Sequence, residues 1–282
     1  MKLLRCGDPG QERPAILDAA GAIRDLSGHV ADIDGTALGD AGLAALRKID
    51  VQSLPLVAAG TRIGPCVGSV GKYVCIGLNY ADHAAEAGMA LPKEPTIFMK
   101  ATSSIIGPND NVVLPKGATQ GDWEVELGFV IGRKASYVGE QDALDYIAGY
   151  FVANDVSERD FQINRGGQWT KGKSCDTFGP IGPWVVTRDE VPDPQKLNLK
   201  LSVNGAVMQS SSTAQMVFGV AKIVSHLSQF MSLHPGDIVA TGTPSGVGLG
   251  RKPQVFLKPG DRMTVTVEGL GEQNQLVVAY DK

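Results

Sequence analysis

Short apolar runs rich in β-branched residues alternate with turn residues from Lys72 to the C-terminus. Runs of this kind, bounded by Gly, Pro, Asp or Asn, are typical of β-strands. Pro-Gly-Asp occurs twice, at 235–237 and 259–261, each time directly before an apolar run, as a turn leading into a strand should. The pattern predicts strands at Tyr73–Gly77, Asp122–Val130, Gly149–Asn154, Asp237–Thr241, Arg262–Val267 and Gln275–Tyr280.

Helical periodicity is clearest in Gln215–Met231, where apolar residues recur every three or four positions. A stripe of this kind packs against a hydrophobic core, so we expect it to be structural rather than functional. Shorter helices are predicted at Tyr80–Gly88, with Asn79 as the N-terminal cap and Gly88 as the stop, and at Gln141–Ile147.

The first 66 residues have a pattern of their own. Short strands are predicted at Met1–Arg5, Ala15–Leu17 and Ala22–Leu26, followed by a helix at Ala41–Ile49. Glycines and a proline then interrupt the pattern, which places a boundary within Pro65–Gly71. We therefore predict a small N-terminal α/β domain at 1–66 and a larger domain at 67–282, with an α+β, β-rich fold overall.

Composition narrows the class of protein. The 282 residues include 35 glycines and 16 prolines, which fits a turn-rich globular fold with an ordinary hydrophobic core. The net charge is −4 and no cluster of Lys and Arg occurs, so we expect no nucleic-acid partner. No apolar run approaches the ~20 residues of a membrane span, and the N-terminus lacks an apolar signal segment. We expect a cytoplasmic protein with no membrane partner.

Two common kinds of site do not fit the sequence. The four cysteines, at 6, 66, 75 and 175, are scattered without a Cys-x-x-Cys pair, which argues against a zinc site and fits reduced thiols. The Gly-rich segment Ala240–Gly248 lacks the Gly-Lys-Ser/Thr ending of a phosphate-binding loop. Nucleotide binding is therefore not expected.

Two glutamates on one predicted strand give the first sign of chemistry. Glu124 and Glu126 are two residues apart, and strand side chains alternate between faces, so both carboxylates should point the same way. Adjacent carboxylates among apolar residues repel each other unless a cation lies between them. Asp155, just beyond the next predicted strand, offers a third carboxylate, and oxygen-only ligands favour Mg²⁺, Mn²⁺ or Ca²⁺ over zinc. A solvated strand face also produces a Glu-x-Glu pair, so the pair alone leaves both interpretations open.

A histidine and a glutamate share one face of the predicted helix Tyr80–Gly88. His83 and Glu86 are three residues apart, and a carboxylate beside an imidazole can orient it as a general base for water. Taken alone, the same spacing is explained by an exposed helix pair worth about a few tenths of a kcal/mol.

Polar residues that could hold a substrate follow Asp155. Arg159 and Gln162 are again helix-face neighbours, and Lys173 lies in the polar run 169–174. Arginine, glutamine and lysine beside a metal can bind substrate carboxylate and carbonyl oxygens. The residue types and spacing alone fit surface residues equally well.

Six segments, in this order, closely resemble the fumarylacetoacetate hydrolase family. The resemblance runs from about Lys72 to the C-terminus, and six ordered motifs are far more specific than any one. The segments are Gly77–His83, Phe98–Lys100, Asp122–Leu127, Asn154–Asp160, Gly172–Ser174 and Thr241–Pro244.

The resemblance implies a role for each candidate residue. Glu124, Glu126 and Asp155 match the family's metal ligands, with Mg²⁺ as the expected ion and Mn²⁺ or Ca²⁺ as alternatives. His83 with Glu86 matches the pair that activates water. The expected substrate and oxyanion contacts are Lys173, Arg159, Gln162 and Thr243, with Lys100 in a shared motif near them.

The resemblance also implies a fold, an assembly and a substrate class. The family fold is a mixed β-roll, usually assembled as a homodimer. The N-terminal region and the run 170–180 are most similar to bacterial members that hydrolyse 2,4-dioxo-3-deoxy derivatives of L-fuconate or L-rhamnonate to pyruvate and lactate. Larger animal members have a further carboxylate ahead of the catalytic histidine, whereas Cys75–Leu78 is apolar here. This difference argues against fumarylacetoacetate itself as the substrate.

The implied activity is metal-dependent hydrolysis of a carbon–carbon bond in a small 2,4-dioxo acid. Three alternatives stay open at this point. The same site could decarboxylate oxaloacetate-like acids or isomerise 2-oxo-enoic acids, and a non-catalytic metabolite-binding protein could keep the scaffold. The complete set of candidate residues argues against the last of these.

Overall fold

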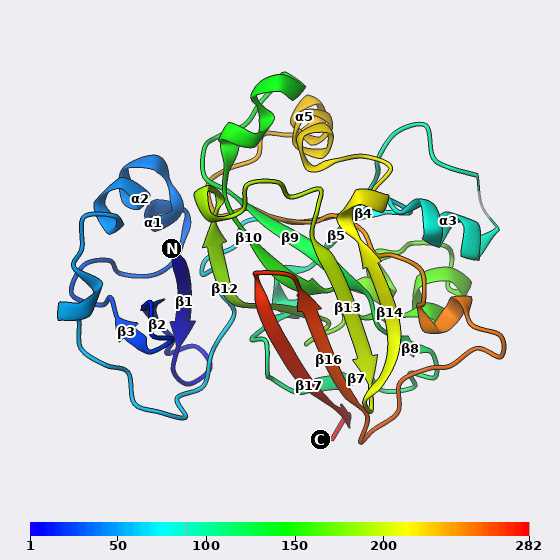
Figure 1. The fold of residues 1–282 in the computed structure, drawn as a ribbon. Coiled ribbons are helices and arrows are strands. Elements are labelled where there is room, and N and C mark those ends of the chain that lie inside the picture. Colours follow the sequence, from blue (N-terminus) through cyan, green and yellow to red (C-terminus); the bar gives the residue numbers. More distant parts are fainter. Residues whose placement is uncertain (89, 282) are drawn as a thin grey trace.

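Two β-sheets packed face to face dominate the computed structural model, which describes residues 1–88 and 90–281 (Figure 1). The larger sheet is mixed, with parallel pairing of β4 (Tyr73–Gly77) to β15 (Ile238–Ala240) and of β6 (Ile105–Ile106) to β12 (Gly179–Thr187). Its main path runs in the order β3 (Ile23–Asp25), β2 (Arg13–Leu17), β1 (Lys2–Cys6), β12, β10 (Ile147–Asn154), β9 (Val125–Ile131), β15, β4 and β5 (Thr96–Lys100).

The second sheet covers one face of the first. Its order is β14 (Ala206–Ser212), β13 (Asn198–Val203), β16 (Arg262–Val267), β17 (Gly271–Ala279) and β7 (Val112–Leu114). A two-stranded ladder joins β8 (Gly121–Asp122) to β11 (Ser157–Glu158). This mixed, β-rich arrangement confirms the predicted α+β fold class.

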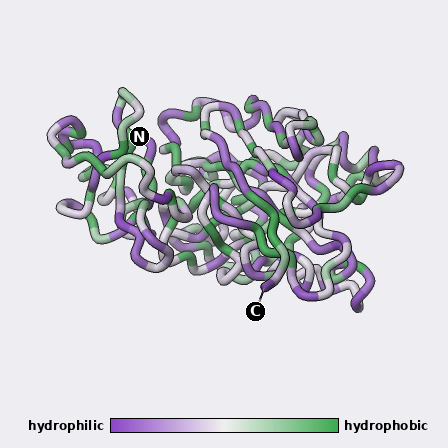
Figure 2. The backbone as a smooth tube through the Cα atoms, turned by 90° about the horizontal axis from the view of Figure 1, so that it is seen from below, coloured by the Kyte–Doolittle hydropathy of each residue, from purple (hydrophilic) through white to green (hydrophobic). Residues whose placement is uncertain are grey.

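The main core lies between the two sheets. Leu127 and Phe129 of β9, Val152 of β10 and Val265 of β16 are fully buried in one apolar cluster, with Trp123 beside them. Figure 2 shows hydrophobic segments running through the interior and hydrophilic ones in the outer loops. Burying one such side chain contributes roughly 1.5–3 kcal/mol, so this layer stabilises the strands that carry the site.

Helices are short and lie at the margins of the sheets. The α-helices are α1 (Gly35–Leu38), α2 (Asp40–Leu46), α3 (Ala81–Ala87), α4 (Thr170–Lys173) and α5 (Val220–Phe230). Shorter 3₁₀ or π turns are η1 (Val51–Ser53), η2 (Thr102–Ser104), η3 (Glu140–Tyr146), η4 (Asp160–Asn164), η5 (Arg188–Glu190), η6 (Thr213–Gln215) and η7 (Gly248–Gly250). The apolar stripe of α5 is buried, as predicted.

Two of the predicted helices differ from the structure, one in its type and one in where it begins. The predicted helix at Gln141–Ile147 is the 3₁₀ turn η3 instead. The predicted helix Gln215–Met231 begins later, because Gln215 ends the turn η6 and α5 starts only after Gly219.

The predicted strand Asp122–Val130 is interrupted. The structure divides it into β8 and β9, and Trp123 and Glu124 belong to neither strand. Asp122 contributes to this break, because its carboxylate accepts a hydrogen bond from Trp123 N–H, which is therefore not paired with a neighbouring strand. The same carboxylate accepts from Gly248 N–H.

Asn79 does not cap the helix that follows it. Tyr80 occupies the cap position of α3, without a side-chain hydrogen bond to the helix. The Asn79 amide instead accepts from Phe218 N–H and donates to the carbonyls of Phe218 and Thr241. The predicted stop is confirmed, since Gly88 has the left-handed φ of 65° that favours glycine.

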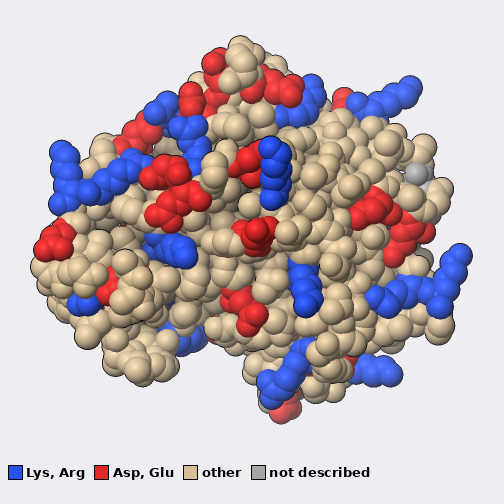
Figure 3. Space-filling view, in the orientation of Figure 1, with Lys and Arg blue, Asp and Glu red and all other residues tan. Residues whose placement is uncertain are grey.

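The N-terminal segment continues the larger sheet. β1 pairs with β12, and Leu3 shares an apolar cluster with Phe151 and Val185 of the larger sheet. The predicted boundary near residue 66 therefore stays a prediction about chain organisation. Within the described residues, no helix has the length and apolar character to span a membrane. On the face shown in Figure 3, acidic and basic side chains are interspersed rather than gathered by sign.

Candidate metal centre and catalytic cavity

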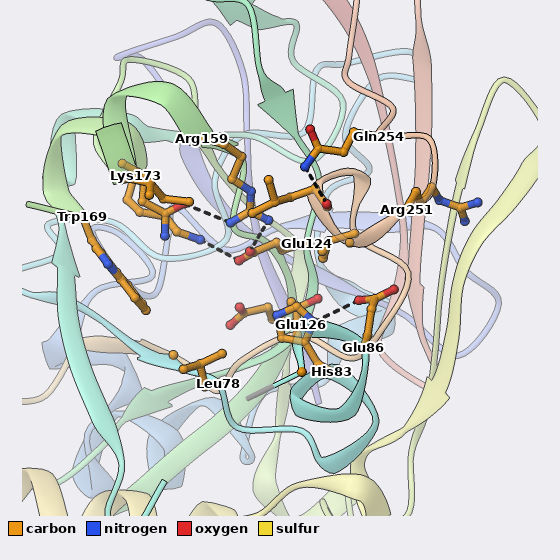
Figure 4. Close-up of a pocket in the computed structure, with 18 of the residues that line it drawn as sticks. Leu78, His83, Glu86, Glu124, Glu126, Arg159, Trp169, Lys173, Arg251 and Gln254 are labelled. Carbon is orange, nitrogen blue, oxygen red and sulfur yellow. Dashed lines mark hydrogen bonds and ion pairs between the residues drawn. The ribbon is translucent and has the colours of Figure 1, made fainter. Parts of the chain in front are cut away.

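One cavity of about 760 Å³ collects eight of the ten candidate residues. Its walls come from α3, the ends of β4 and β5, the segment from η4 to α4, and the loop after β15 (Figure 4). The candidates that line it are His83, Glu86, Glu124, Glu126, Arg159, Gln162, Lys173 and Thr243. Asp155 and Lys100 are buried outside this lining.

Three carboxylates converge at the cavity floor. Oxygen atoms of Glu124, Glu126 and Asp155 lie within 4.8 Å of one another, and all three residues are buried. Glu126 belongs to β9, Glu124 directly precedes it, and Asp155 directly follows β10. Because Asp155 N–H donates to Glu124 O, the adjacent strand ends hold the two residues side by side.

Protein groups hold the Asp155 and Glu126 carboxylates in place. Lys100 Nζ lies 2.5 Å from Asp155 Oδ1, and Gly242 N–H donates to Glu126 Oε2 at 2.8 Å. Lys100 also donates to Val156 O and is 2% exposed, so its side chain has no room to reach a substrate. The geometry makes Lys100 a support for Asp155, and a substrate contact for Lys100 stays a prediction that this geometry does not favour.

Cationic side chains surround Glu124. Arg159 Nη2 forms an ion pair with Glu124 Oε1 at 2.7 Å, and Lys173 Nζ donates to Glu124 Oε2 at 2.7 Å and to Asp155 Oδ2 at 2.9 Å. Burial opposes ionisation of Glu124, but the Lys173 and Arg159 charges outweigh it and lower the pKa of Glu124 to about 2. Burial also opposes ionisation of Lys173, but the negative charges of Asp155 and Glu124 outweigh it and raise the pKa of Lys173.

Glu126 differs from Glu124 because burial and like charges dominate its surroundings. Burial, reinforced by repulsion from Asp155 and Glu124, raises the pKa of Glu126 well above its usual range. Among the described residues, no lysine or arginine forms an ion pair with Glu126, and its one protein donor is Gly242 N–H. A buried carboxylate of this kind, within reach of two further carboxylates, fits a hard divalent cation.

The histidine–glutamate pair lines the same cavity as Glu124 and Glu126 (Figure 4). His83 Nδ1 is 3.2 Å from Glu86 Oε2 on one face of α3, and the other ring nitrogen has no hydrogen-bond partner among the described residues. Gly246 N–H donates to Glu86 Oε1 at 2.9 Å, and Gly250 packs so closely on Glu86 that an added Cβ would lie 2.5 Å from Cδ. The predicted pair is thus partly buried and held by the loop, which an exposed helix pair would not be.

Arg159 and Gln162 also contact each other. Arg159 Nη1 donates to Gln162 Oε1 at 3.0 Å, and Arg159 Nε donates to Asp122 Oδ2 at 2.8 Å. Asp122 is fully buried and also accepts from Gly248 and Leu249 N–H, so it anchors both Arg159 and the cavity loop. Asp122 stands in a motif that sequence reasoning had identified, but only its contacts disclose this role.

Thr243 lines the cavity with its hydroxyl already engaged. The hydroxyl donates to Val125 O at 2.8 Å and accepts from Gln209 Nε2 at 2.8 Å. Its single proton is therefore not free for a substrate oxyanion in this arrangement. The oxyanion role implied by the resemblance stays a prediction that this geometry does not favour.

Sequence reasoning missed an aromatic wall. Phe98 and Trp169 meet edge to face with ring centroids 5.3 Å apart, and Lys173 Nζ lies 5.2 Å from the Phe98 ring centroid. Trp169 can approach because Gly77 has no side chain, and an added Cβ would lie 2.6 Å from Trp169 Cζ3. The sequence did offer one signal for this wall, because Trp169 directly precedes the segment that carries Lys173.

Gly77→Ala should impair catalysis without unfolding the protein. The new methyl group would displace the Trp169 indole and, with it, the start of α4. We expect kcat/KM to fall on the order of tenfold or more, because displacements of about 1 Å can cost 10²-fold. The measurement is steady-state kinetics with Trp fluorescence. Gly28→Ala is the matched control, since nothing lies within 4 Å of its Cβ position. Unchanged kinetics in Gly77→Ala would show that the wall is irrelevant to the reaction.

The cavity mouth adds polar residues that the sequence did not mark. Arg251, Lys252 and Gln254 follow η7 and line the cavity. Arg251 Nη2 donates to Met208 O, and Gln254 Nε2 donates to Leu249 O. No motif identified this loop, because its residues meet the site only through the fold.

Residues 72–278 match the fumarylacetoacetate (FAA) hydrolase C-terminal family, and the chain belongs to this family. This confirms the family resemblance seen in the sequence. A Burkholderia cenocepacia protein provisionally named a hydrolase is 63% identical over 276 residues, which cover 98% of each chain.

Two solved structures show the range of activities among similar proteins. The structure named maleylpyruvate hydrolase from Sphingobium sp. SYK-6, in complex with manganese(II) ion and pyruvate, is 28% identical with a TM-score of 0.83 and full coverage of both chains. The structure named 2-hydroxyhepta-2,4-diene-1,7-dioate isomerase from Mycobacterium marinum is 35% identical with a TM-score of 0.77 and full coverage of both chains. The family thus includes hydrolases and isomerases, and a relative in it binds a divalent metal.

Proposed function

We propose that the protein is a divalent-metal-dependent hydrolase that cleaves a carbon–carbon bond in a 2,4-dioxo acid, releasing pyruvate and a second carboxylic acid. The observation that carries this proposal is the convergence of three buried carboxylates at a cavity that the supported His83–Glu86 pair also lines. The manganese and pyruvate in the similar maleylpyruvate hydrolase support the same reaction class.

Glu124, Glu126 and Asp155 would hold the cation. Mg²⁺ is the ion we propose, with Mn²⁺ or Ca²⁺ as alternatives, because all three ligands are carboxylates. When bound, the cation would supply Lewis acidity toward the keto and carboxylate oxygens of the substrate.

His83 is the proposed general base. Glu86 receives Gly246 N–H on one oxygen and faces His83 Nδ1 with the other, so it fixes the orientation of the ring. The free ring nitrogen can then take a proton from water as the water oxygen attacks the C4 carbonyl of the substrate. General-base assistance of this kind contributes about 10²–10⁴-fold.

Bond cleavage follows from collapse of the hydrated C4 centre. The C3–C4 bond breaks, its electron pair moves onto C3 and the C2 carbonyl, and the proton held by His83 returns to C3 to complete pyruvate. Lys173 and Arg159 provide positive charge at the cavity floor, and Gln162 has an amide that can donate to substrate oxygens. One water is consumed, and the two products account for all atoms.

An isomerase of 2-oxo-enoic acids is the second candidate, because a structure at 35% identity carries such a name. An isomerase would shift the absorbance of its substrate without fragmentation, whereas the proposed hydrolase releases pyruvate. A decarboxylase of oxaloacetate-like acids would release carbon dioxide and would not need water activation by His83.

The decisive experiment is a coupled assay for pyruvate over stereoisomeric 2,4-dioxo-3-deoxy sugar acids and simple acylpyruvates, with and without EDTA. We propose the 2,4-dioxo-3-deoxy derivatives of L-fuconate or L-rhamnonate as the substrates, on the resemblance of the N-terminal region and the run 170–180 to those family members. We expect pyruvate release that EDTA abolishes and Mg²⁺ restores. Full activity after exhaustive chelation would refute the metal mechanism.

A further inference from the structure

Among the described residues, the edge of β9 opposite β10 has no neighbouring strand beside Val125–Leu127. β15 pairs with β9 only from Gly128 to Val130 and ends at Ala240. The edge at Val125–Leu127 therefore needs other hydrogen-bond partners, because buried backbone groups left unpaired are costly.

Side chains complete this edge in place of a strand. Thr241 donates to Leu127 O from both N–H and Oγ1, and Thr243 Oγ1 donates to Val125 O at 2.8 Å. The N–H of Val125 donates to Gln209 Oε1 at 2.9 Å. Gln209 reaches this point from β14, the edge strand of the other sheet.

Gln209, Thr243 and Val125 close a ring of three hydrogen bonds. Gln209 is 1% exposed, and its amide nitrogen donates to Thr243 Oγ1 at 2.8 Å and to Pro244 O at 2.9 Å. All of its amide groups therefore act on the backbone of β9 or on the loop after β15. Val125 is the residue between Glu124 and Glu126, so the ring fixes the backbone from which both carboxylate side chains extend.

We propose that Gln209 is a positioning residue for the metal centre, which sets the spacing of Glu124 and Glu126 from the opposite sheet. The inference rests on the proposed metal-dependent function. It assigns to Thr243 the same positioning role, in place of an oxyanion contact. Partners that orient metal ligands typically change metal affinity or activity by about 10–100-fold when removed.

The test is Mn²⁺ affinity of Gln209→Met, measured by electron paramagnetic resonance titration beside thermal stability. Methionine keeps the length of the side chain but can neither accept from Val125 N–H nor donate to Thr243. We expect the Mn²⁺ dissociation constant to rise about 10–100-fold. Gln195→Met is the matched control, because Gln195 also accepts a backbone N–H, from Val220, and donates to a carbonyl, that of Thr213, but lies off the cavity. It should lose stability with Mn²⁺ affinity unchanged.

Thr243 provides a second set of variants if Gln209→Met folds poorly. Thr243→Val removes the hydroxyl from the ring and should weaken Mn²⁺ binding, whereas Thr243→Ser keeps the hydroxyl and should restore it. The double variant Gln209→Met/Thr243→Val should bind Mn²⁺ little worse than either single variant, because both break the same ring.

The outcomes separate this inference from the proposed function. Wild-type affinity in both Gln209→Met and Thr243→Val, with tight Mn²⁺ binding by the wild type, would overturn the inference and leave the function intact. Additive losses in the double variant would also overturn it, since they would show that the two residues act independently. A wild-type protein that binds no Mn²⁺ would overturn both.

Discussion

Glu126→Gln should abolish activity and weaken divalent-metal binding by more than about 10²-fold, beyond the usual cost of losing an orienting partner. Glutamine occupies nearly the same space but removes a negative charge that, among the described residues, forms no ion pair with a lysine or arginine. The measurement is Mg²⁺ or Mn²⁺ titration by calorimetry, together with pyruvate release.

Glu158→Gln is the matched control for this change. Glu158 is equally buried, but it accepts from the N–H groups of Thr119, Gln120 and Phe161 and supports loops rather than the metal centre. This control should lose stability while Mn²⁺ affinity stays unchanged. If Glu126→Gln bound the metal as tightly as the wild type, Glu126 would not be a ligand.

The same substitution should make the metal-free protein more stable at neutral pH. A carboxyl whose pKa is raised by folding stabilises the native state below its unfolded pKa of about 4.3, and this stabilisation is lost as pH rises through the folded value. Metal-free wild type should therefore lose stability from acidic to neutral pH at this site, while Glu126→Gln lacks that loss. Thermal unfolding of both proteins with EDTA at several pH values measures this difference. If the stability of both proteins changed with pH in the same way, the raised pKa of Glu126 would be contradicted.

His83→Ala should lower kcat by about 10²–10⁴-fold while leaving metal affinity unchanged. The imidazole is the proposed base, and none of the three converging ligand atoms belongs to it. This separation of turnover from metal binding distinguishes a base from a ligand. The measurements are single-turnover kinetics and Mn²⁺ titration on the same preparation.

His226→Ala is the control for a histidine outside the site, since His226 packs against Phe230 on α5. The turnover of Glu86→Gln should lie between that of His83→Ala and that of the wild type, because the amide can still contact the ring but removes the carboxylate charge beside it. Equal loss of turnover and metal affinity in His83→Ala would count against its role as base. Retained pyruvate release from oxaloacetate in that variant would favour a decarboxylase.

Periodicity and short motifs predicted much of this molecule because they report local physics. The alternation that predicted convergence of Glu124 and Glu126 uses only local strand geometry, and the two carboxylates do converge although Glu124 directly precedes β9. The apolar stripe of α5 and the left-handed stop at Gly88 are likewise local. Motif order identified the family, and with it the eight candidate residues that line one cavity.

Other features escaped the sequence because they arise between distant segments. The strand prediction at 122–130 missed the break at Trp123 and Glu124, which depends on Asp122 receiving Gly248 N–H from far along the chain. The cap prediction for Asn79 failed because tertiary partners at Phe218 and Thr241 compete for its amide. Lys100 was expected near substrate, but only the packed core shows that it meets Asp155 instead.

The sequence by itself determined the family, the strand-rich fold and the residue types of the site, since these follow from periodicity and from motifs read along one chain. Only the tertiary structure decided which charges are neutralised, which hydroxyl is already bonded and which backbone edge a distant amide completes. Hydrogen bonds and Coulomb forces act over a few ångströms in space, whatever the separation along the chain. For that reason Gln209 carries no local signal, although it lies against the strand that holds the carboxylates.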